Sequence, residues 1–133
     1  IMGATAFQKG LGGVHALSHP IGAVFDTHHG LANAIMLPYV LVRNQSAIEQ
    51  RLADAARYIG LADTSFTGFP DWILRLRSDL NIPHTLADIG IDERRADEIG
   101  AAAKQDPSDG GNPIALTPAD YSAIFRAAVQ GAV

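Results

Sequence analysis

The sequence predicts an all-α fold, a helical bundle formed by a single domain of 133 residues. Apolar residues recur at helical spacing along most of the chain, and no segment shows the strict alternation of a half-buried β-strand. Short clusters rich in glycine, proline, asparagine and aspartate separate the periodic segments. Five or six moderate helices joined by short loops are typical of such a bundle.

The composition restricts the classes of function. Hydrophobic residues make up 47% of the chain and charged residues 18%, which favours a packed core over disorder. The formal net charge is −4 and the basic residues form no run, so we expect binding to neither nucleic acid nor a membrane surface. No segment approaches the ~20 apolar residues of a spanning helix. The absence of cysteine fits a cytoplasmic protein.

The first predicted helices surround a group of histidines. A short apolar helix is expected over residues 1–9, followed by a helix over 13–25. Because proline lacks an N–H and disfavours helix at the residue before it, Pro20 predicts a kink or break. This break would place His19 at a helix end. Residues 26–30 are expected to form the loop to the next helix.

The next two helices differ in character. The helix predicted over 29–43 is apolar almost all round, which indicates burial, and Pro38 is expected to interrupt it. Ser46 and Glu49 have the spacing of a capping box. They predict the start of an amphipathic helix that runs to about Tyr58.

Turn residues delimit the remaining helical segments, which we expect over residues 71–79, 85–89, 93–104 and 118–129. Asp92 is the predicted N-cap of the third of these segments. Residues 106–113 read as the clearest loop in the chain. Thr117 and Pro118 have the residue types preferred at the N-cap and at the first position of a helix.

Four of the five histidines, His15, His19, His28 and His29, lie within 15 residues. Histidine is the commonest metal ligand. On a helix, His15 and His19 share one face, and His29 at the start of the next helix could join them. A site for Zn²⁺ or Fe²⁺ needs three or four ligands. Since Asp26 is the only carboxylate nearby, a complete site requires a residue from elsewhere, and the alternative is histidines packed with satisfied ring nitrogens.

This region resembles the signature of the iron-containing (group III) alcohol dehydrogenases. The resemblance rests on GGVHALSHPIGA at 12–23 and HGLANAIMLPYV at 29–40, and it is supported by AFQKGLG at 6–12 and NPIALTPADY at 112–121. In that family the signature lies in an all-helical C-terminal domain, after an N-terminal nucleotide-binding α/β domain. The resemblance therefore implies that residues 1–133 are the metal-binding C-terminal domain and that the N-terminal domain is absent from this chain.

The resemblance also implies roles for the histidines. In that family the metal is Fe²⁺, or Zn²⁺ or another divalent ion, and the two signature ligands correspond to His15 and His29. An Asp and a His from earlier helices complete the site. His19 corresponds to a residue beside the nicotinamide and the substrate, with a catalytic and cofactor-binding role. His28 stands where proline is common, and it is either a surface loop residue or part of the cleft. The fifth histidine, His84, is expected to be structural or exposed.

The implied activity is hydride transfer between a small-molecule alcohol or aldehyde and NAD or NADP. The resemblance implies a full-length protein that is a homo-oligomer, and the 133-residue chain alone is expected to have little or no turnover. The alternatives are a related enzyme acting on glycerol, maleylacetate or dehydroquinate, or a non-catalytic helical interaction domain. Because the chain begins at Ile1 without an initiator Met, we interpret it as part of a longer protein.

Overall fold

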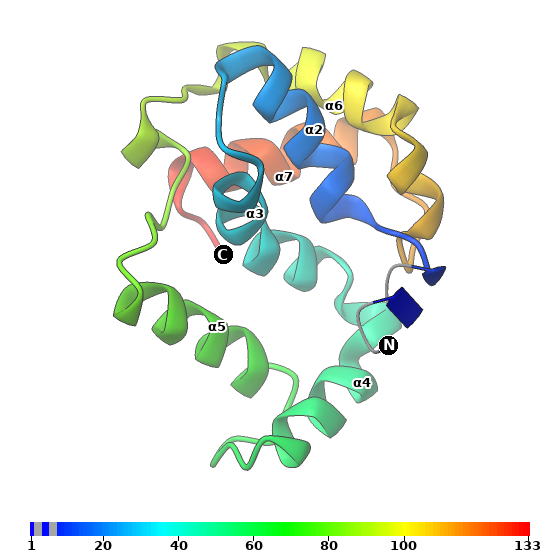
Figure 1. Ribbon diagram of the computed structural model, residues 1–133, viewed down its shortest axis with the longest axis vertical. Helices are drawn as coiled ribbons and strands as arrows, with labels where there is room; N and C mark the ends of the chain where they lie inside the picture. The colour runs from blue at the N-terminus through cyan, green and yellow to red at the C-terminus, as the bar shows by residue number, and fades with distance from the viewer. Residues whose placement is uncertain (2–3, 6–7) are drawn as a thin grey trace.

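The computed structural model describes residues 1, 4–5 and 8–133, and within these ranges every regular element is helical. The all-α prediction is confirmed. The helix expected over 1–9 includes 2–3 and 6–7, which lie outside the described residues. The elements (Figure 1) are α2 (Gly13–Phe25), α3 (His29–Arg43), α4 (Gln45–Tyr58), α5 (Gly68–Asp79), η1 (Ala87–Ile89), η2 (Glu93–Arg95), α6 (Ala96–Gln105), η3 (Pro107–Gly111) and α7 (Pro118–Gln130).

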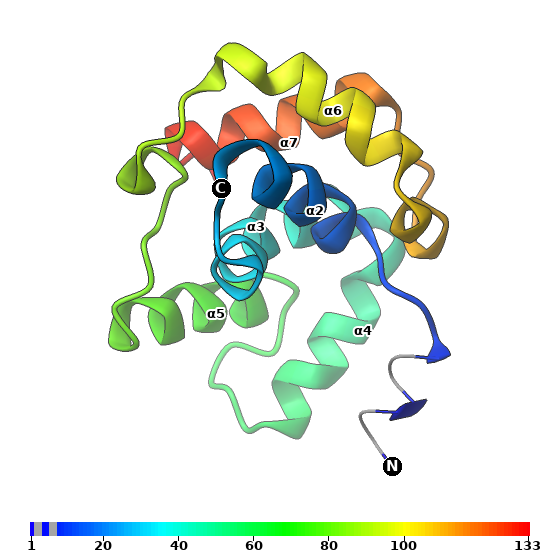
Figure 2. The same ribbon diagram turned by 45° about the horizontal axis from the view of Figure 1, so that its top comes forward.

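Helices α2, α3, α6 and α7 pack into one body, whereas α4 and α5 extend from it (Figures 1 and 2). Helices α6 and α7 lie side by side, and α2 packs against both α6 and α3. The hydrophobic core sits among these four helices, and its largest fully buried side chains include Leu17, Ile35, Tyr121 and Phe125. No described helix is long and apolar enough to cross a membrane.

Of the kink or break predicted at Pro20, the break is wrong, because α2 continues through this residue to Phe25. His19 consequently lies in the helix interior rather than at a helix end. A proline inside a helix costs ~3 kcal/mol, but burial of each large aliphatic side chain returns ~1.5–3 kcal/mol. Leu17 and Ile21 are fully buried on either side of the proline, and their packing therefore holds the helix together.

The interruption predicted at Pro38 is also wrong. Helix α3 runs without a break over the predicted range and ends at Arg43. Ile35 and Met36 are fully buried one turn or less before the proline, and Tyr39 directly after it is almost fully buried. As in α2, tertiary burial outweighs the local preference of proline.

The capping box predicted from Ser46 and Glu49 does not form. Helix α4 begins earlier, at Gln45, and its N-cap residue Asn44 makes no side-chain cap hydrogen bond. Asn44 is at the same time the C-cap residue of α3, so the chain changes helix at a single residue. Ser46 therefore lies inside the helix, where it cannot act as an N-cap.

Helix α5 begins at Gly68, three residues before the predicted start. A Cβ atom at Gly68 would lie 2.0 Å from the carbonyl oxygen of Asp63, so only glycine allows the preceding loop to fold this closely onto the helix. The loop before α5 therefore packs against the first residue of the helix, ahead of the predicted start at residue 71.

The predicted caps of the C-terminal half are confirmed. The Asp92 side chain accepts a hydrogen bond from the backbone N–H of Arg94, although the helix it precedes is split into η2 and α6. Thr117 and Asp120 form a reciprocal capping box at the start of α7, with Pro118 at its first position. The predicted loop over 106–113 contains the short helix η3.

Candidate functional site

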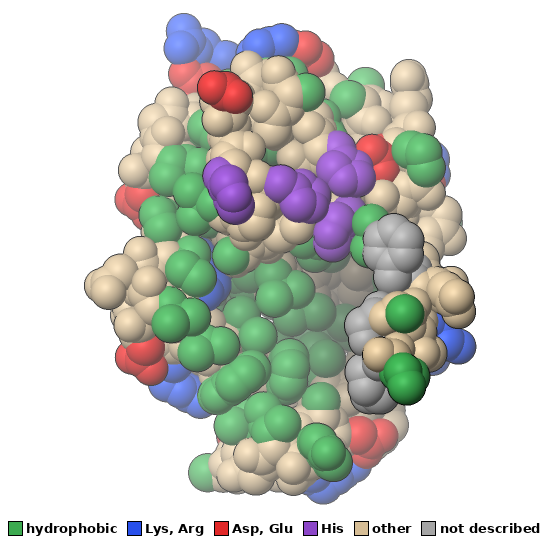
Figure 3. All heavy atoms as spheres, in the orientation of Figure 1, with side chains coloured by type: hydrophobic (Ala, Val, Ile, Leu, Met, Phe, Trp, Pro, Cys, Tyr) green, Lys and Arg blue, Asp and Glu red, His purple; other side chains and the backbone are tan. Residues whose placement is uncertain are grey.

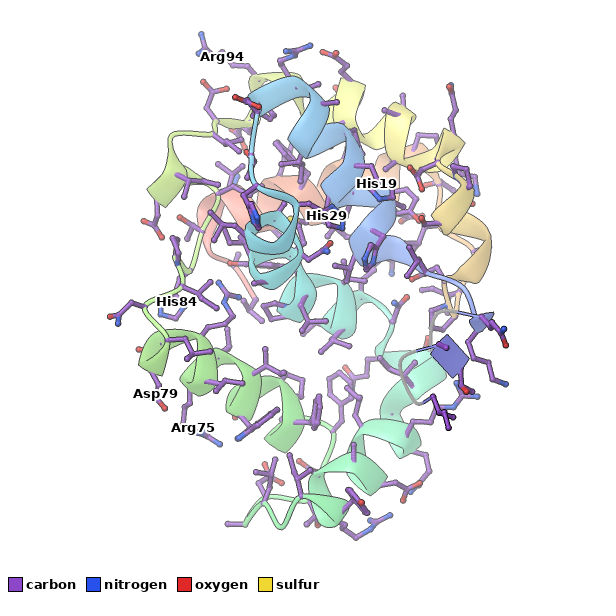
Figure 4. All side chains as sticks on the ribbon, viewed as in Figure 1. His19, His29, Arg75, Asp79, His84 and Arg94 are labelled. Atoms are coloured by element: carbon purple, nitrogen blue, oxygen red, sulfur yellow. The ribbon has the colours of Figure 1, made fainter. Side chains whose placement is uncertain are left out.

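Three histidines gather where α2 meets the start of α3. His15 and His19 lie one turn apart on α2, and His29 is the first residue of α3. Their ring centroids are 5.9 Å apart for His15 and His19, 5.2 Å for His15 and His29, and 5.2 Å for His19 and His29. Figure 4 labels His19 and His29 on the two helices, and Figure 3 shows the histidine side chains gathered on one face. The structure thus brings all three predicted site residues together.

Hydrogen bonds define which nitrogen of His29 carries a lone pair. The Ser18 hydroxyl donates to the His15 carbonyl oxygen at 3.2 Å, and its Oγ lies 3.4 Å from Nδ1 of His29. Because the hydroxyl proton is used by the carbonyl, Oγ accepts from Nδ1–H of His29. The lone pair of this imidazole is therefore on Nε2. Ser18 is fully buried in α2, which holds this arrangement in place.

The amide of Asn33 joins the two predicted ligands. Its Nδ2 lies 3.0 Å from Nε2 of His29 and 3.4 Å from Nε2 of His15. An amide NH₂ group is a donor, so both Nε2 atoms face it with their lone pairs. The Oδ1 atom of Asn33 is buried without a hydrogen-bond partner. Two imidazole lone pairs therefore converge on the Asn33 amide nitrogen, and the oxygen of the same amide has no hydrogen-bond partner.

This donor set fits a divalent metal ion. Imidazole binds a metal in its neutral form. Burial lowers the pKa of His15 below its ordinary value, and the nearby His29 and His19 lower it further, while Asp106 opposes them. Within the described part of the chain, no group of three or more His, Cys, Asp or Glu side chains is arranged to hold a metal ion. His15 and His29 would therefore form part of a site that needs further ligands.

His19 has a different partner from the other two histidines. Its Nδ1 lies 2.8 Å from Oδ2 of Asp106, the residue between α6 and η3. Burial alone would raise the pKa of Asp106, but hydrogen bonds from the Ser108 backbone and hydroxyl and from His19 bring this pKa below its ordinary value. Asp106 is therefore ionised near neutral pH, and its carboxylate holds the His19 ring at Nδ1.

Sequence reasoning missed Ser18, Asn33 and Asp106. Asn33 follows His29 by four residues, so the spacing of neighbours on one helix face could have indicated it. Asp106 is 87 residues from His19, and no local pattern joins them. His28 is exposed and directly precedes α3, and this exposure fits both the surface-loop and the cleft interpretation.

A cavity of about 680 Å³ opens beside His15. His15 and Asn33 contribute polar groups to its wall, while most of the remaining wall is apolar. Figure 3 shows the broad hydrophobic surface that continues away from the histidines. The apolar side chains that line the cavity include Leu11, Val14, Leu37, Val40, Leu41, Ile48 and Leu52.

Solved structures that share this fold include an oxidoreductase and an alcohol dehydrogenase. The chain superposes on a 1,3-propanediol oxidoreductase with a TM-score of 0.84 and 34% identity, covering 89% of this chain and 32% of that one. It superposes on an alcohol dehydrogenase from Oenococcus oeni with a TM-score of 0.81 and 32% identity, again covering 89% and 32%. The fold of this chain is thus shared with about a third of each of these two enzymes.

Sequence comparison leads to the same family. The C-terminal part of the Fe-containing alcohol dehydrogenase family matches residues 1–129, and the chain belongs to this family. Lactaldehyde reductase of Escherichia coli (strain K12) is 33% identical over 125 residues, which cover 90% of this chain and 33% of that protein. NADPH-dependent butanol dehydrogenase of Clostridium saccharobutylicum is 36% identical over 135 residues, covering 95% and 35%. The chain spans about a third of the length of these relatives.

Proposed function

We propose that residues 1–133 form the metal-binding helical part of an NAD(P)-dependent alcohol dehydrogenase or aldehyde reductase. The observation that carries this proposal is the convergence of the Nε2 atoms of His15 and His29 on the amide of Asn33. Two neutral imidazoles with lone pairs aimed at one point are suited to hold Fe²⁺, Zn²⁺ or another divalent ion. His15 and His29 are accordingly the proposed metal ligands of this chain.

A bound divalent metal would supply Lewis acidity toward a substrate oxygen, and NAD or NADP would supply the hydride acceptor. His19 lies beside both proposed ligands and is partly exposed, so it can contact substrate and nicotinamide. We assign to it the transfer of a proton at Nε2, which receives the proton of the alcohol during oxidation and returns it during reduction. Its role is thus catalytic and cofactor-binding, without metal ligation.

The rest of the enzyme would come from a preceding segment of the polypeptide. Because the relatives are about three times longer than this chain, we propose that an N-terminal nucleotide-binding domain and two further metal ligands lie there. The named relatives act on small alcohols and aldehydes, which supports a substrate of that class. The whole protein would be a homo-oligomer, and the 133-residue chain alone would have little or no turnover.

The test is metal content and turnover in the whole protein that contains this chain. His15→Ala and His29→Ala should each lose bound metal, as measured by elemental analysis of purified protein. His19→Ala should keep most of the metal and lose turnover, and His84→Ala, which alters an exposed histidine, should keep both. Unchanged metal content in both ligand variants would overturn the assignment. Steady NAD(P)⁺-dependent oxidation by the 133-residue chain alone would refute the need for a preceding domain.

A further inference from the structure

We propose that Asp106 is a positioning residue that fixes the tautomer of His19, with the proton on Nδ1 and the lone pair on Nε2. The proposal concerns how His19 is held, and its functional meaning rests on the proton-transfer role proposed above. It follows from one contact between two distant parts of the chain, the middle of α2 and the end of α6.

The direction of this hydrogen bond is set by chemistry. A carboxylate only accepts, so the 2.8 Å contact between His19 Nδ1 and Asp106 Oδ2 requires a proton on Nδ1. In a neutral imidazole the other nitrogen then carries the lone pair. Among the described residues, no hydrogen bond engages Nε2 of His19. Nε2 is therefore the nitrogen left free for a proton from outside.

Asp106 is itself held firmly. Its Oδ1 accepts from the backbone N–H of Ser108 at 2.8 Å, which makes it the N-cap of η3. Its side chain is 13% exposed, against 42% for His19. One face of the His19 ring stacks on the His29 ring, with an angle of 15° between the two ring planes. The carboxylate and the neighbouring ring together define the orientation of His19.

A purely structural role for Asp106 would be the capping of η3, and Asp106→Asn separates the two roles. Asparagine is as good an N-cap as aspartate, so the amide oxygen keeps the bond from Ser108 N–H. The NH₂ group then takes the place of Oδ2 and faces His19 as a donor. Nδ1 of His19 must now accept, which moves the proton to Nε2.

The tautomer can be read directly by nuclear magnetic resonance. The metal-free chain is labelled with ¹⁵N-histidine and studied well above pH 6.5, where imidazoles are neutral. Long-range ¹H–¹⁵N correlations distinguish a protonated ring nitrogen from a bare one, and His19→Gln identifies the His19 signals. The wild type should show protonated Nδ1 and bare Nε2. Asp106→Asn should show the reverse, while the control Asp109→Asn on the same short helix should leave His19 unchanged.

Two results would overturn the proposal. One is a wild-type His19 with its proton on Nε2, and the other is an Asp106→Asn chain that folds, by circular dichroism, with the wild-type tautomer. If Asp106→Asn does not fold, the wild-type pattern alone decides, because a neutral ring with its only proton on Nε2 has no Nδ1 proton to donate to the carboxylate. The measurement uses neither metal nor nicotinamide. The tautomer measurement can therefore support its proposal even if the metal-content test of the His15 and His29 variants fails. Equally, the metal-content test can succeed if the tautomer measurement fails.

Discussion

The amide of Asn112 joins three parts of the molecule, and its removal should cost much of the stability. Its Oδ1 accepts from the backbone N–H of Gly13 at 3.1 Å and from Nδ2 of Asn44 at 2.9 Å. Its Nδ2 donates to Oδ1 of Asn44 and to the carbonyl oxygen of Ile114, both at 2.9 Å. These contacts join the start of α2 to the α3–α4 junction, where Asn44 is 3% exposed. Asn112→Ala removes all of them.

The expected loss follows from the number of bonds. A typical internal hydrogen bond contributes ~1 kcal/mol to stability, and a buried polar group left without a partner costs ~1–3 kcal/mol. Asn112→Ala breaks four bonds and should lower the free energy of unfolding by ~4 kcal/mol. Asn44→Ala breaks only the two bonds to Asn112 and should cost ~2 kcal/mol. The double variant should lose ~4 kcal/mol, since those two bonds are broken only once.

The assay is equilibrium unfolding in urea, followed by circular dichroism, for the wild type, both single variants and the double variant. A loss below about 1 kcal/mol for Asn112→Ala would refute the reasoning, because one bond alone contributes that much. Full additivity of the two substitutions would also refute it, since it would mean that Asn44 and Asn112 do not interact.

Three further predictions concern packing and charge. Gly100→Ala should destabilise the chain by ~1–3 kcal/mol in urea unfolding. A Cβ at this position would lie 2.2 Å from the Ser122 hydroxyl and 2.5 Å from the Pro118 carbonyl oxygen, both in α7. An unchanged urea midpoint would contradict this prediction. Arg77 is buried and donates to three carbonyl oxygens, so Arg77→Ala should cost ~3–5 kcal/mol, whereas the exposed Arg75→Ala should cost under ~0.5 kcal/mol. Hydrogen bonds, first from the Thr117 backbone, lower the pKa of Asp120 from 3.8 to about 2. The Asp120 carboxylate therefore adds stability above pH 3.8 that is lost as the pH falls towards 2, and Asp120→Asn should flatten the fall of Tm over this range.

Local rules predicted the helices well where the cause was itself local. The capping residue Thr117 and the range of α3 agree with the structure, because a cap and an apolar face act within a few residues. The same rules failed at Pro20 and Pro38, where both helices continue. There the burial of neighbouring side chains, which depends on the whole fold, exceeds the cost of proline.

The candidate site was likewise predictable where its residues lie close in the sequence, and not where they are far apart. His15, His19 and His29 lie close in the sequence, and a helix followed by a second helix start is enough to bring them together. The contact of Asp106 with His19 depends on where α6 ends relative to α2. That position results from the packing of α2 against α6, which no local pattern specifies.

The segment 106–112 lies at the surface yet is attached to its surroundings through the side chains of Asp106, Asp109 and Asn112. Asp106 holds His19, Asn112 holds the start of α2, and Asp109 accepts from Lys104 and from the hydroxyl of Tyr121. Surface loops usually accept inserted residues and exchange their amide protons quickly. Here one inserted residue would shift these side chains away from three helices at once. This stretch should therefore exchange its amide protons as slowly as the helices around it. In a library of random single-residue insertions, the variants that still fold should carry no insertion within it.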